Sequence, residues 1–130
     1  MGAYGPRADE LMDGLPGLMT LATAEALLPR TRAATPASAA TTAAATLANT
    51  LTDLRSLALT AEVHGDDGAR DLRFRAALAE AIGGARGLAL ASSAQPTKGD
   101  LAHTRMGVNA VLLAAGRRGL AAEDAAPSRA

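Results

Sequence analysis

Apolar residues recur at spacings of three and four along most of the chain, as in helices that each bury one face. The most regular stripe runs through the segment 36–63 over about four heptads. Asn49 and Asp53 fall outside it. We therefore predict a continuous helix over 36–63, with Thr35 as its N-cap and Pro36 at its first position. Its apolar stripe consists of Ala37, Ala40, Ala44, Leu47, Leu51, Leu54, Ala58 and Ala61.

The same region also allows a different interpretation. Residues 33–54 are almost wholly Ala and Thr, a low-complexity composition that fits a linker between two structured pieces. The segment 36–46 is the weakest part of the predicted helix, because Thr lowers helix propensity and a short helix gains most of its stability from packing. Leucines 47, 51 and 54 favour the helix, because they lie on the stripe and polar residues do not.

A broken helix is predicted near the N-terminus. Apolar residues follow helical spacing from Asp9, but Gly14, Pro16 and Gly17 interrupt them. Because Pro is tolerated in the first turn of a helix and breaks its interior, we expect a short turn over 8–13 and a separate helix from Pro16 to Leu28.

A third helix is predicted over 69–89, and it contains Gly83, Gly84 and Gly87. Each of these costs about 0.8–1 kcal/mol relative to Ala in a helix interior. The helix either breaks at Gly83-Gly84 or uses its glycines to let another helix come close, and we favour the close approach. Its stripe consists of Phe74, Leu78, Ala81, Ala85 and Leu88.

A fourth helix is predicted over 100–115, with Gly116 or Gly119 at its end. Short connections favour antiparallel neighbours, so the expected fold is an all-α, four-helix up-and-down antiparallel bundle with Ala/Gly-rich close helix packing. We expect a disordered N-terminus over 1–8, a single helical-bundle domain over 9–120 and a disordered tail over 121–130. The second helix, about 42 Å long at 1.5 Å per residue, should project beyond its neighbours.

Composition narrows the function. The chain of 130 residues has 13 basic and 13 acidic residues, which argues against general attraction to nucleic acid or anionic lipid. It has no Cys, which excludes disulfides and thiolate metal sites. No apolar leader and no run of about 18 strongly apolar residues is present, so we expect a cytoplasmic protein that does not enter a membrane.

Oxygen and imidazole ligands gather in one stretch of the sequence. The cluster at 62–71 would suit a divalent ion, but it has neither the calcium-loop spacing nor the Glu-x-x-His pairs of di-iron bundles. Helix ends explain each of its residues, since His64 would lie at a helix C-terminus and the aspartates at a helix N-terminus. We therefore predict no metal. The residues are Glu62, His64, Asp66, Asp67 and Asp71.

A group of arginines suggests a face that binds phosphate. However, Asp67 and Asp71 stand three and four positions before an arginine, so local ion pairs would neutralise the positive charge of those arginines. No aromatic residues alternate with the arginines to stack on bases. We expect a solvated face and consider nucleic acid an unfavoured partner. The arginines are Arg70, Arg73 and Arg75, with Arg105, Arg117 and Arg118.

Catalytic arrangements are absent from the sequence. Ser92 and Ser93 lack a nucleophile elbow, and His103 is expected on the surface of its helix. The glycines of 83–88 follow no strand, so they do not form a phosphate loop. We predict no catalytic, cofactor-binding or metal-binding residue and expect no enzyme activity. The carboxylates expected off the apolar stripes are Asp53, Glu62, Asp71 and Glu80.

The expected function is therefore protein–protein interaction, by self-association or by docking of a partner helix. The main alternative is a nucleic-acid-associated regulator that uses the arginine face of the third helix. A metal-binding protein or enzyme that uses residues 62–71 is the third possibility.

Overall fold

The computed structural model describes residues 4–26, 36–61, 67–90 and 98–120. The side chains of residues 36–42, Asp67 and Lys98 lie outside this description. The described part of the chain forms helices and no strand: α1 (Gly5–Ala26), α2 (Pro36–Thr60), α3 (Asp67–Leu90) and α4 (Lys98–Ala114).

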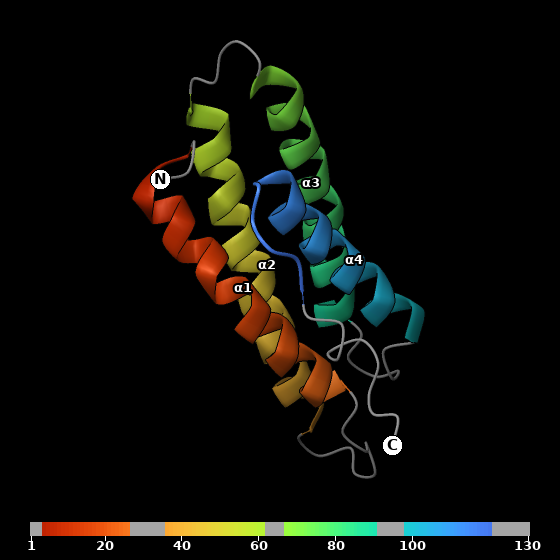
Figure 1. The fold of residues 1–130 in the computed structure, drawn as a ribbon. Helices are drawn as coiled ribbons and strands as arrows, with labels where there is room; N and C mark the ends of the chain where they lie inside the picture. Colours follow the sequence, from red (N-terminus) through yellow and green to blue (C-terminus); the bar gives the residue numbers. More distant parts are fainter. Residues whose placement is uncertain (1–3, 27–35, 62–66, 91–97, 121–130) are drawn as a thin grey trace.

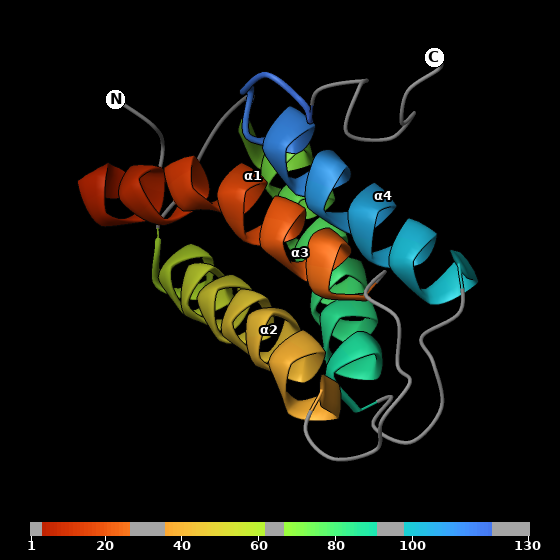
Figure 2. The same cartoon turned by 90° about the horizontal axis from the view of Figure 1, so that it is seen from below.

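The helices alternate in direction, up and down, in chain order (Figure 1). Each packs against the next along the chain, and α4 returns to α1 to close the bundle (Figure 2). The α1–α4 contact is the smallest of the four. The predicted all-α, four-helix up-and-down bundle is confirmed.

α1 differs from its prediction, because it is one helix that continues through Pro16. It also starts at Gly5, inside the stretch 1–8 that was expected to be disordered. A proline inside a helix costs about 3 kcal/mol. Here it lies on the exposed face, and burial of the opposite face outweighs its cost. That buried face recurs at spacings of four and three: Ala8, Met12, Leu15, Met19 and Ala22.

α2 confirms the predicted helix over 36–60 and ends before Val63. The linker interpretation is therefore wrong for the described part of 33–54. The stripe is buried wherever its side chains are described before the helix end: Ala44, Leu47, Leu51, Leu54 and Ala58 each have 0% exposure. α2 has 25 residues and α3 has 24, so α2 is longer than this neighbour by one residue. The expected projection of its first turns stays a prediction, because the side chains of 36–42 lie outside the description.

The backbones of α3 and α4 touch where two glycines meet the facing helix. A Cβ on Gly84 would lie 3.0 Å from Thr104 Cα, and a Cβ on Gly107 would lie 2.7 Å from Ala81 Cα. Close approach is thus confirmed for Gly84, and α3 does not break there. Gly83, by contrast, is exposed.

α4 ends at Ala114, and of the two glycines predicted to end it, Gly116 takes that role. This residue has a φ of +79°, which L side chains rarely adopt. Its N–H donates to Leu113 O (2.9 Å) and the N–H of Arg117 donates to Leu112 O (2.9 Å), the pair of hydrogen bonds that defines a Schellman motif. The chain then turns back as a strap, residues 117–120. The N–H of Leu120 donates to Asn109 Oδ1 at 2.7 Å.

The α3–α4 crossing generates the first prediction. Gly107→Ala places a methyl group against backbone, which cannot yield as a flexible side chain can. We expect the free energy of unfolding to fall by about 1–3 kcal/mol. Gly14→Ala is the matched control, because Gly14 is exposed and no described atom lies within 4 Å of its added Cβ. It should raise stability by about 0.8–1 kcal/mol. Urea unfolding followed by circular dichroism measures both, and equal effects would contradict the close contact.

Candidate functional site

Little of the predicted metal cluster lies in the described part of the chain. Glu62, His64 and Asp66 are outside it, as is the side chain of Asp67. Among the described residues, no group of three or more His, Cys, Asp or Glu side chains is placed to hold a metal ion. The candidate cluster is therefore represented by Asp71.

Asp71 was expected to lie off the apolar stripe of its helix, and this prediction is wrong because the residue is buried. Only 7% of it is exposed. Its Oδ1 accepts a hydrogen bond of 2.5 Å from the hydroxyl of Tyr4, and its Oδ2 lies 2.9 Å from Arg75 Nε. The predicted pairing of Asp71 with Arg75 is confirmed, but it is largely buried. Arg75 Nη2 also donates to Ala58 O, 3.2 Å away.

These contacts tie three helices together at one end of the bundle. Tyr4 precedes α1, Asp71 and Arg75 belong to α3, and Ala58 belongs to α2. The ring of Tyr4 also stacks on Phe74, with centroids 4.6 Å apart and planes inclined by 15°. These are the only two aromatic residues of the chain. Since the carboxylate is engaged on both oxygens, we interpret this cluster as a structural clamp.

The clamp generates a second prediction. Asp71→Asn keeps the shape of the side chain and removes its charge, so Arg75 loses its partner in a shielded place. We expect a loss of about 1–3 kcal/mol in the free energy of unfolding. Asp53→Asn on the exposed side of α2 should change it by less than about 0.5 kcal/mol. Urea unfolding measures both variants. If Asp71→Asn lowered the free energy of unfolding by no more than Asp53→Asn does, the clamp would contribute nothing to stability.

The predicted arginine face is not assembled as one surface. Arg75 reaches α2, and Arg117 reaches across to α1, where it pairs with Asp9 and Asp13. Arg70 packs beside Gly116, and Arg105 is half-buried on α4. The exposed members are Arg70 and Arg73 on α3 and Arg118 on the strap.

The remaining candidates do not converge. Residues 83–88 lie inside α3, which rules out a phosphate loop there. His103 is exposed, as predicted, and its Nε2 lies 3.7 Å from Glu80 Oε1. Ser92 and Ser93 lie outside the described residues. Within the described ranges, therefore, no nucleophile faces a general base.

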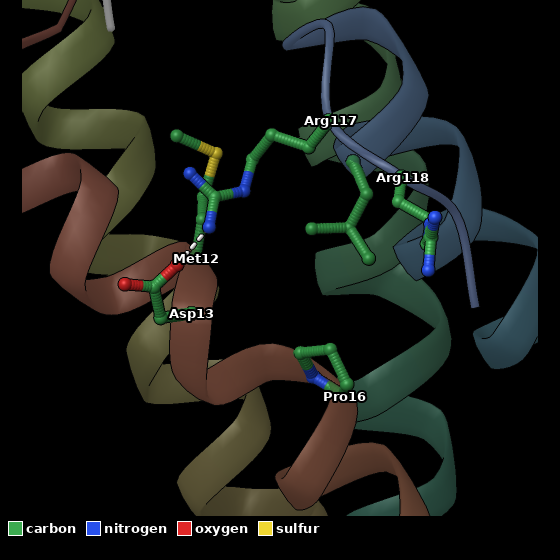
Figure 3. A pocket seen from close by; sticks show the side chains of 6 residues that line it. Met12, Asp13, Pro16, Arg117 and Arg118 are labelled. Atoms are coloured by element: carbon green, nitrogen blue, oxygen red, sulfur yellow. Dashed lines mark hydrogen bonds and ion pairs between the residues drawn. The ribbon is translucent and has the colours of Figure 1, made fainter. Parts of the chain in front are cut away.

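An open groove lies between α1 and the end of α4, with a volume of about 470 Å³. Met12 and Leu112 lie beneath it and are only 2% and 1% exposed. Figure 3 shows Arg117 and Arg118 leaving the strap in opposite directions. Arg117 donates to Asp13 Oδ1 across the groove and lies 3.8 Å from Asp9 Oδ1. The lining residues are Met12, Asp13, Pro16, Leu112, Arg117 and Arg118.

A second feature is the surface that α3 turns away from the bundle, which we call the outer α3 face. Two of its leucines are largely exposed: 70% of Leu72 and 79% of Leu90. Small exposed residues lie between them at helical spacing as far as Gly83, and the exposed Arg86 lies on the same side between Gly83 and Leu90. The face consists of Leu72, Ala76, Ala79, Gly83 and Leu90.

Comparison of the chain with models of known protein families, with curated proteins and with solved structures finds no match in any of the three. Within the described residues, no helix is both long enough and apolar enough to cross a membrane.

Sequence reasoning missed both the groove and the outer α3 face. The face was readable, since its residues repeat at spacings of four, three and four on the side opposite Phe74 and Leu78. The groove was not, because it depends on Arg117 meeting α1 from far along the chain. A weak signal existed in Asp9 and Asp13, which share one side of a helix at i, i+4.

Proposed function

We propose that this protein is a non-catalytic helical bundle that acts by protein–protein association, and that its outer α3 face pairs with the same face of a second copy. The observation that carries the proposal is the exposed stripe of small residues between Leu72 and Leu90. Large exposed apolar side chains that line up on one helix face are typical of contact surfaces.

The glycine in this stripe supports close packing. Gly83 lowers helix stability by about 0.8–1 kcal/mol relative to Ala. At Gly83, as at Gly14, Gly17 and Gly87, no described atom outside the glycine's own helical turn lies within 4 Å of the position a Cβ would take, so packing within the described residues does not require glycine there. Gly84 and Gly107 show how this molecule uses such residues elsewhere: each lets a facing helix approach to backbone contact. We infer the same use for Gly83, with the facing helix supplied by another molecule.

The face is self-complementary, which favours a second copy as the occupant. Leu72 and Leu90 are about five helical turns apart, so they have the same orientation around α3. In an antiparallel pair with two-fold symmetry, Leu72 would meet Leu90 of the other copy and Ala79 would meet Gly83 of the other copy. Such reciprocal pairing is the property of an isologous interface. The chain has a formal net charge of zero, so overall charge repulsion between two copies does not oppose this pairing.

The nucleic-acid alternative loses support. Its arginines were expected to share one face, but Arg75 pairs with Asp71 of its own helix and reaches the Ala58 carbonyl of α2, while Arg117 pairs with Asp13 of α1. Docking of a different partner helix on the same outer α3 face remains the alternative outcome of the tests below.

Mass in solution tests the proposal. At tens of micromolar, sedimentation equilibrium should give twice the chain mass of 13.0 kDa. Ala79→Glu buries a charge at the centre of the pairing and should return the protein to monomer. The matched control is Ala45→Glu on the exposed side of α2, which should remain dimeric. A monomeric unmodified protein would exclude the second copy.

Gly83→Ala is expected to have opposite effects on the stability of the monomer and on the affinity of the dimer. In the monomer the added methyl meets open space, so the free energy of unfolding at low protein concentration should rise by about 0.8–1 kcal/mol. In the dimer the same methyl separates the facing helices, and the dissociation constant should rise by about tenfold. Urea unfolding and a sedimentation dilution series measure the two effects. If the variant is more stable and dimerises equally well, close packing at Gly83 is wrong.

A further inference from the structure

Glu80 and His103 form a pair at the edge of the outer α3 face. Glu80 stands between Ala79, which belongs to that face, and Ala81, which meets Gly107 of α4. Successive residues of a helix are turned by about 100°, so Glu80 lies between the outer α3 face and α4. His103 of α4 is its neighbour there, with Nε2 3.7 Å from Glu80 Oε1. Both side chains are exposed, so this edge presents one carboxylate and one imidazole to solvent.

Pairing of two outer α3 faces brings two copies of this edge together, a step that rests on the proposed dimer. The pairing of Ala79 with Gly83 of the other copy places the two-fold axis beside residue 81, midway between them. Glu80 is next to that point, so the two Glu80 residues are displaced by only about 3 Å along the helix axis. In an antiparallel pair with two-fold symmetry, equivalent edges of the two helices face each other. The two pairs of Glu80 and His103 therefore meet at the axis.

The meeting of two carboxylates favours a cation between them. They repel each other across the axis, and the uncharged form of His103 does not offset their charge. Arg86 is not placed to do so, because it lies about 120° around α3 from Glu80, on the opposite edge of the outer α3 face. Arg73 lies about two helical turns before Glu80. The position on the axis is thus suited to a bound divalent cation.

We propose that the dimer binds one zinc ion on its two-fold axis, held by Glu80 and His103 of both copies. Two imidazole nitrogens and two carboxylate oxygens form a tetrahedral set that suits Zn²⁺. Tetrahedral bonds of about 2.0–2.2 Å place two ligand atoms roughly 3.3–3.6 Å apart. The distance of 3.7 Å between Nε2 and Oε1 is close to this separation. Among the described residues of one copy, no third His, Cys, Asp or Glu joins the pair, so the site is complete only in the dimer.

Zinc should therefore tighten the dimer. In a sedimentation dilution series at neutral pH, we expect the dissociation constant in Zn²⁺ to be at least about tenfold lower than in EDTA. The zinc-loaded protein should contain one ion per two chains. His103→Gln should abolish the effect of zinc and keep the dimer that forms in EDTA. The control is His64→Gln, which changes the other histidine of the chain and should leave the response to zinc unchanged.

Glu80→Gln tests the repulsion between the two carboxylates. Because it removes both charges, it should lower the dissociation constant in EDTA by several-fold and abolish the response to zinc. A weaker dimer of this variant in EDTA would overturn the proposal, because it would show that Glu80 pairs with a cation of the other copy.

The outcomes separate the zinc site from the dimer itself. A dimer with the same dissociation constant in Zn²⁺ and in EDTA would reject the zinc site and leave the outer α3 face as the interface. A monomer under both conditions would reject the dimer and the site together. One zinc ion per chain, or loss of the zinc response in His64→Gln, would place the metal elsewhere and overturn the proposal. Far-ultraviolet circular dichroism of each variant checks that the helices are retained.

Discussion

Backbone contact between α3 and α4 is the constraint on which the bundle depends. The chain has one Tyr, one Phe and no Trp, so it cannot fill a wide space between helices with large side chains. Gly84 and Gly107 solve this by letting the two helices approach until backbone meets backbone. Dispersion contacts are weak one by one and fall off steeply with separation, so a core rich in alanine is effective only at this short distance. The rest of the packing follows from that spacing.

α1 has little contact with α4, and polar interactions from distant parts of the chain hold it to α3 and to the strap that follows α4. At one end of the molecule the hydroxyl of Tyr4 binds Asp71, and its ring stacks on Phe74. Near the end of α4, Arg117 spans from the strap to Asp13. Both contacts act on the part of α1 that precedes Pro16. The buried face of the helix, from Ala8 to Ala22, is what extends to both sides of the proline, and its burial explains why the helix continues.

The outer α3 face and the groove have different physical properties. The outer α3 face carries small residues between two exposed leucines, so it suits a helix of another molecule. The groove is open, and Met12 and Leu112 beneath it are almost wholly buried, so it exposes mainly the side chains of its rim.

The sequence by itself determined the helices with regular apolar stripes. The run through Leu47, Leu51 and Leu54 specified α2, and Gly116 specified the end of α4, because spacing and helix-end chemistry are local properties. Only the tertiary structure decided that α1 continues through Pro16, that Asp71 is buried, and that Arg117 closes the groove. Each of these depends on a group far along the chain, namely the core against α1, Tyr4 and Asp13. Their energies come from contacts between helices, which the local pattern of residues does not contain.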